Sequence, residues 1–219
     1  MAVSQIHLLP ESAEALAGVG MPQLAFLCCV LGYSLLLFID NLFKTRRRLK
    51  PVLILDPATG HTDEEFFPRR KREGVSAVGT LTVALAVHSL IEGMAIGVQE
   101  RYYTLFDLGL AILFHKVPAL FSYSLKLRSQ GALSALAFLL LVCMSSPAGI
   151  ALGLLFNNFR LGELTGVLSG LCSGTFLYIT CQELVAREFS VESQLWSKFG
   201  CFCTGIATVV FTGLVFSED

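Results

Sequence analysis

Residues 75–99 read VSAVGTLTVALAVHSLIEGMAIGVQ, a long apolar run in which His88 and Glu92 are the ionisable residues. A helix of about 20 apolar residues crosses the hydrocarbon core of a bilayer, which is roughly 30 Å thick. This stretch therefore predicts a membrane-spanning helix. Ionisable side chains inside such a helix are costly, so His88 and Glu92 also mark a candidate functional site.

The composition of the whole chain agrees with this interpretation. Of its 219 residues, 54% are hydrophobic and only 15% are charged, whereas soluble domains carry about 25% charged residues. High hydrophobicity and a net charge of -1 also exclude a disordered chain, and they provide no basic surface for nucleic acid. The seven cysteines lie in apolar stretches, so we interpret them as small apolar residues rather than a disulfide framework. We expect an all-α polytopic membrane bundle.

Five further stretches meet the length and apolarity of a membrane span. The six predicted spans are residues 21–43, 75–99, 102–125, 131–156, 163–183 and 199–216. Small residues recur within two of them, and they let membrane helices approach each other closely. These residues are Gly149 and Gly153 in one span and Gly166, Gly170 and Gly174 in the next.

Basic residues predict the orientation. More than half of the 16 lysines and arginines lie between Lys44 and Arg72, which predicts that residues 44–74 form a cytoplasmic loop. Six spans then place both termini, the C-terminus included, on the extracellular side. We expect residues 1–20 to be the extracellular or lumenal remnant of an upstream helix, 21–43 the first span, and 75–216 a transmembrane region of five helices.

Three ionisable residues of two neighbouring spans carry the expected chemistry. His88 and Glu92 are four residues apart and share one helix face, and His115 lies near the middle of the next span. The short connection around residues 100–103 makes the two helices antiparallel neighbours, so their midpoints meet. Two imidazoles and a carboxylate suit Zn²⁺ or another borderline divalent ion. Water, Ser89 or another helix would complete an open site, from which an ion can also leave.

Other interpretations of these residues stay open. An intramembrane histidine often serves only as a hydrogen-bonding residue. Glu92 and Lys116 could form a salt bridge across the two helices that leaves no place for an ion. A proton relay is a further functional interpretation of the same groups.

Several more residues in the spans are unusual. Pro118 cannot donate a backbone hydrogen bond and should free the carbonyl group of Phe114. Such irregular backbone is tolerated at this depth only where it faces protein or a water-filled path. Asp40 and Asp107 are expected at the membrane interface, whereas Glu183, at the end of its span, is ambiguous.

Particular motifs resemble a known family. Residues 88–99, HSLIEGMAIGVQ, resemble H-S-x-x-E-G-x-A-x-G-x-Q, the fourth-helix signature of the ZIP family of zinc and iron transporters. His115-Lys116 with residues 121–127, FSYSLKL, resembles its fifth helix. Residues 174–180, GTFLYIT, resemble the seventh helix of the branch that contains the small animal ZIPs of the plasma membrane. The resemblance runs from about His7 to the C-terminus.

The resemblance implies transport of a divalent metal ion, with zinc first, toward the cytosol. We expect the ion to be held by His88, Glu92 and His115, with accessory roles for four further residues. These are Ser89, Gly93, Lys116 and Pro118. Zinc would be the cargo rather than a resident cofactor, and His and carboxylate ligands also accept Fe²⁺, Mn²⁺ or Cd²⁺.

The resemblance also implies eight helices, two more than the sequence predicts. Residues 7–11, HLLPE, resemble the end of the family's second helix, so the chain is expected to be truncated at its N-terminus. The alternative function is therefore a non-transporting paralogue, a membrane partner that forms a homo- or heterodimer with ZIP-like chains. A proton-coupled carrier of another class is a third hypothesis. An enzyme is not expected, because no nucleophile–base pair, phosphate-binding loop or redox motif is present.

The chain departs from the family pattern at the second metal position. Many members carry an acidic or amide residue where Lys116 stands, Glu where Ala119 stands, and Glu before the proline where Ser146 stands. An ammonium group would oppose a second divalent ion, so we expect one ion, with Lys116 as a fixed counter-charge that helps to release it. Within residues 44–72 the only histidine is His61, so we do not expect that loop to sense metal.

Overall fold

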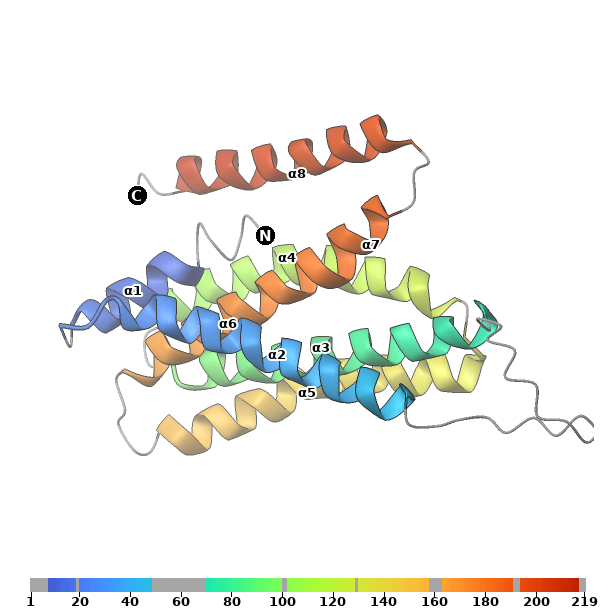
Figure 1. Cartoon of the computed structure of the whole chain (residues 1–219). Coiled ribbons are helices and arrows are strands. Elements are labelled where there is room, and N and C mark those ends of the chain that lie inside the picture. The colour runs from blue at the N-terminus through green and yellow to red at the C-terminus, as the bar shows by residue number, and fades with distance from the viewer. Residues whose placement is uncertain are drawn as a thin grey trace, which may run out of the picture.

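Helices make up the regular secondary structure of the described residues, and no strand occurs among them. The computed structural model describes residues 8–18, 20–48, 70–99, 102–128, 130–157, 163–190 and 194–216. The helices are α1 (Leu9–Ala17), α2 (Leu24–Arg48), α3 (Arg70–Gly97), α4 (Tyr102–Leu127), α5 (Ala132–Asn157), α6 (Leu164–Tyr178), α7 (Ala186–Phe189) and α8 (Leu195–Phe216), shown in Figure 1. A π-helical segment, Ile179–Val185, continues α6 and was not predicted from the sequence.

Each of the six predicted spans falls on a helix, and the all-α bundle is confirmed. Among the described residues, five helices are long and apolar enough to cross a membrane; they lie in α2, α3, α4, α5 and the continuous α6 with its π-helical segment. The sixth predicted span lies in α8, where the described apolar part, Leu195–Phe211, is shorter than a span. Most of the predicted basic loop, residues 49–69, lies outside the described residues.

The spans pack in two tight pairs. The most extensive contacts join α3 to α5 and α2 to α6, and α1 also packs on α6. A Cβ atom on Gly93 of α3 would clash with the backbone of α5 at Ser146, and one on Gly149 would clash with the backbone of α3 at Leu90. A Cβ atom on Gly174 would likewise clash with the backbone of α2. The close approach predicted at the small residues is therefore confirmed.

Of three apolar clusters among the described residues, two lie at opposite ends of the bundle, and the third joins α1 to α2. We call the end where α2 finishes and α3 begins the basic end; it lies to the right in Figure 1. One cluster fills this end and includes Leu81, Leu85, Tyr123, Val142 and Tyr178. The other fills the opposite end and includes Leu8, Ile91, Ala95, Leu108 and Leu168. In α3, Leu85 precedes His88 and Ala95 follows Glu92, so these two ionisable residues lie between two apolar layers.

The outer faces of the bundle are apolar. Phe38 on α2 is 62% exposed, Phe114 on α4 is 73% exposed and Leu133 on α5 is 82% exposed. Such surfaces fit contact with lipid chains. The α8 helix lies apart from the spans in Figure 1 and meets α7, where the Phe189 and Phe202 rings are 6.3 Å apart.

Candidate metal site

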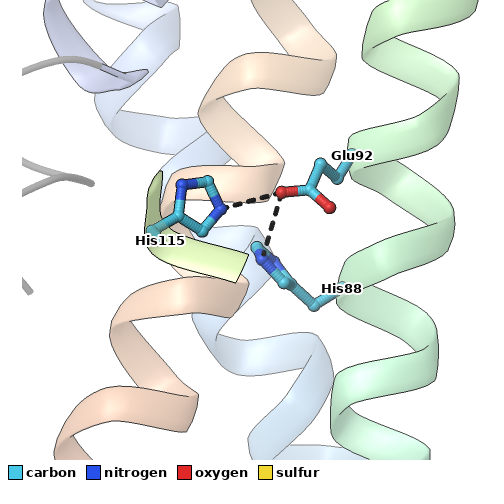
Figure 2. A group of neighbouring side chains, drawn as sticks. All are labelled: His88, Glu92 and His115. Atoms are coloured by element: carbon cyan, nitrogen blue, oxygen red, sulfur yellow. Dashed lines mark hydrogen bonds and ion pairs between the residues drawn. The ribbon is translucent and has the colours of Figure 1, made fainter. Parts of the chain in front are cut away.

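Three buried side chains from two helices converge between the apolar layers. His88 and Glu92 belong to α3 and His115 to α4, and Figure 2 shows both imidazoles turned toward one carboxylate oxygen. The distance from Glu92 Oε1 is 2.8 Å to His115 Nε2 and 4.0 Å to His88 Nε2. Each residue offers one ligand atom, and these atoms lie within 4.8 Å of one another. The predicted convergence is confirmed, and metal binding by these residues stays a prediction.

The second oxygen of Glu92 has a different partner. Lys116, the residue after His115 on α4, donates a hydrogen bond from Nζ to Glu92 Oε2. The same ammonium donates to Ser146 Oγ on α5 at 2.7 Å. The salt bridge foreseen as an alternative therefore exists, but it uses only Oε2. Oε1 still faces the two imidazoles, so the salt bridge and the candidate metal site coexist.

The outer nitrogens of both imidazoles are hydrogen-bonded. His115 Nδ1 lies 2.8 Å from the carbonyl oxygen of Ala111, one turn earlier in α4. A carbonyl oxygen only accepts, so Nδ1 donates this bond, and Nε2 must likewise donate to the Glu92 carboxylate oxygen; a bound ion would replace the hydrogen on Nε2. His88 Nδ1 lies 2.9 Å from Thr175 Oγ1 of α6. Metal-binding histidines usually have such a partner on the nitrogen that does not face the metal.

Phe176, the residue after Thr175 in α6, packs its ring beside the cluster. The Phe176 ring centroid is 5.0 Å from that of His115 and 5.4 Å from that of His88. Sequence reasoning missed Thr175 and Phe176 as site residues, although both lie in the 174–180 motif. A hydroxyl residue inside an apolar span was the only local signal available.

A cavity of about 40 Å³ adjoins the cluster. Its further lining comes from Leu85, Ala119, Leu120, Val142, Ile179, Thr180 and Leu184. All of these residues lie on the basic-end side of the cluster in their respective helices. The volume has room for roughly three water-sized occupants, enough for an ion with water ligands.

The predicted accessory residues have different positions. Ser89 is buried and lines the cavity. Gly93 packs against α5, as described above. Pro118 is exposed on the outer face of α4, which continues through it, and is not among the residues that line the cavity.

Asp40, which was expected at the membrane interface, is buried within the bundle near the end of its span. Its side chain is 3% exposed, and it hydrogen-bonds the hydroxyl group of Tyr178. Glu183, which was ambiguous, is 2% exposed. The side chain of Asp107 lies outside the described residues. The hydroxyl group of Tyr178, on another helix, gives the buried Asp40 a polar partner.

The apolar bundle and its buried His/Glu cluster define a multi-pass integral membrane protein with a candidate metal site. Residues 73–213 match the family described as "ZIP Zinc transporter", and the chain belongs to this family. The predicted family resemblance is thereby confirmed.

Curated relatives are similar to this chain over about three fifths of its length. Zinc transporter ZIP2 from Mus musculus is 34% identical over 140 residues, which are 61% of this chain and 45% of that protein. Zinc transporter ZIP1 from Bos taurus is 37% identical over 144 residues, 63% of this chain and 44% of that protein. The chain therefore spans less than half the length of these relatives. No solved structure matches.

Proposed function

We propose that the chain carries a divalent metal ion, zinc first, across the membrane toward the cytosol. The ion would be held at mid-membrane by His88, Glu92 and His115. The observation that carries the proposal is the meeting of two imidazole nitrogens and a carboxylate oxygen within 4.8 Å, in a buried position. Family membership and relatives named zinc transporters support metal as the cargo. The same donors also bind Fe²⁺, Mn²⁺ and Cd²⁺.

The proposed direction rests on charge and on the cavity. The basic segment 44–74 favours a cytoplasmic basic end, with the C-terminus outside. The cavity extends from the cluster toward that same end, while apolar side chains fill the bundle on the other side. An ion at the cluster would thus have its nearest free space, the cavity of about 40 Å³, on the proposed cytoplasmic side. The branch resemblance favours the plasma membrane.

One ion is proposed, because Lys116 occupies the position beside Glu92 Oε2. The ion would take Oε1 and Nε2 of both histidines, with water from the cavity as a further ligand. Lys116 then remains as a fixed positive charge next to the bound ion. Coulomb repulsion from this charge weakens retention of the ion and opposes a second one.

The test is uptake of radioactive zinc into cells that express this 219-residue chain. His88→Ala and His115→Ala are the test variants, and His61→Ala is the matched control in the basic loop. We expect uptake above background that both test variants abolish and the control retains. Membrane insertion is checked for every variant by surface labelling. Uptake that survives His88→Ala and His115→Ala would disprove the proposed site.

A chain that inserts but carries no zinc would favour the alternative function. It would then act as a membrane partner in a dimer with a ZIP-like chain, and the exposed apolar face of α4, with Phe114 and Phe121, would be available for such contact. Co-purification with a full-length relative and reduced uptake by that relative would support this alternative. Flux that depends on pH and not on metal would instead support a proton-coupled carrier.

A further inference from the structure

A threonine on another helix hydrogen-bonds the nitrogen of His88 that faces away from Glu92. Thr175 Oγ1 lies 2.9 Å from His88 Nδ1, and both side chains are buried, with exposures of 0% and 4%. The two residues come from α6 and α3, which pack against each other. The contact therefore ties one proposed ligand to a helix that contributes no proposed ligand of its own.

The partners of Thr175 determine which nitrogen of His88 carries the proton. Thr175 Oγ1 donates its own hydrogen to the carbonyl oxygen of Cys172 at 2.9 Å. Its lone pairs remain to accept from His88, so Nδ1 is the N–H donor. A neutral imidazole has only one N–H, which leaves the lone pair on Nε2, the nitrogen that faces Glu92.

We propose that Thr175 is a positioning residue that holds His88 in the tautomer and ring orientation needed to bind the ion through Nε2. This inference rests on the proposed function, because the lone pair on His88 Nε2 serves to bind the ion. The hydrogen bond from Thr175 Oγ1 to the carbonyl oxygen of Cys172 keeps the hydroxyl group in place. Cys172 Sγ lies 3.7 Å from the same nitrogen and is a weaker acceptor than the hydroxyl oxygen.

The test compares Thr175→Val, which removes the hydroxyl group at nearly constant shape, with Thr175→Ser, which keeps it. Thr82→Val is the matched control. Thr82 is equally buried, donates to the carbonyl oxygen of Val78 at 2.7 Å and pairs with Tyr123, and it lies on the ligand helix α3 without contact to a ligand. Zinc affinity is measured on the purified full chain in lipid nanodiscs by competition with a chromophoric chelator.

We expect Thr175→Val to weaken zinc binding about tenfold or more, as loss of a partner behind a metal ligand usually does. Thr175→Ser should restore affinity to within about threefold of the parent, and Thr82→Val should leave it unchanged. Equal affinity of Thr175→Val and the parent would overturn the proposal. A similar loss of zinc affinity in Thr82→Val would also overturn the proposal.

A second measurement needs no metal. Nitrogen NMR of the ¹⁵N-histidine-labelled chain at pH 8 reports the tautomer of His88, whose signal is assigned by its loss in His88→Gln. We expect the proton on Nδ1 in the parent and in Thr175→Ser, and a mixture of tautomers in Thr175→Val. A proton on Nε2 in the parent would overturn the proposal. If the parent binds no zinc, the proposed function fails, and the tautomer still decides whether Thr175 positions His88.

Discussion

Lys116 and Glu92 form an ion pair that uses one carboxylate oxygen and leaves the other to the imidazoles. Nζ donates to Oε2, while Oε1 lies 2.8 Å from His115 Nε2. An unpaired charge in a buried position costs several kcal/mol, so the ammonium balances the carboxylate inside the bundle. The same pairing leaves Oε1 available to a metal ion.

Glu92→Gln should damage both stability and metal binding. It leaves the Lys116 ammonium without its counter-charge, so we expect the free energy of unfolding to fall by about 3 kcal/mol. Zinc affinity should fall by about 100-fold or more, because the carboxylate ligand is lost. Thermal unfolding in detergent and chelator competition provide the measurements.

The double variant Glu92→Gln/Lys116→Met separates the two effects. Removal of both charges should recover most of the lost stability, while zinc affinity stays low. If the double variant is as unstable as Glu92→Gln, the ion pair is not the reason for the loss.

Lys116→Glu should change the metal stoichiometry. A carboxylate in place of the ammonium removes the repulsion and adds a donor, so the bound zinc should rise from one to two ions per chain. Elemental analysis of the purified protein measures the ratio. Lys198→Glu is the control: this lysine of α8 pairs with Glu188 of α7, so the variant makes the same charge change away from the site. Unchanged stoichiometry and uptake in Lys116→Glu would rule out the counter-charge role.

Gly149→Ala should push α5 away from α3, the helix of His88 and Glu92. Its Cβ atom would clash with the α3 backbone at Leu90, and such overpacking costs about 1–3 kcal/mol. Gly109→Ala is the control, because no atom lies within 4 Å of the added Cβ and alanine favours a helix by up to about 1 kcal/mol. We expect a lower melting temperature and weaker zinc binding only in Gly149→Ala. Similar melting temperatures for the two variants would contradict the close packing of α3 and α5.

Phe176→Ala should accelerate zinc release. The ring covers both imidazoles, and its removal opens the ligands to water, which can replace them on the ion. Stopped-flow transfer of zinc to a chelator should be several-fold faster than in the parent. Phe176→Leu should be intermediate, and Phe26→Ala, at a residue 57% exposed on α2, should have no effect. An unchanged release rate would show that the ring does not shield the ion.

The sequence predicted the helices and the three central site residues for local reasons. Apolar length identifies a span, and the spacing of four residues puts His88 and Glu92 on one face of α3. The short connection to α4 brings His115 to the same depth. These inferences need only helix geometry and nearest neighbours along the chain.

Only the tertiary structure assigned the partners across distant helices. The sequence did not identify Thr175 behind His88, Phe176 against both rings, or the burial of Asp40. Helices that are apolar all round do not show in sequence which face packs against which neighbour. That choice depends on close backbone approach at residues such as Gly149 and on polar pairs between helices far apart in the chain. The sequence itself therefore determines the positions of the spans and the shared face of His88 and Glu92. Packing decides how the imidazoles are oriented and where the cavity lies. It also decides that Lys116 takes one oxygen of Glu92 and the histidines face the other.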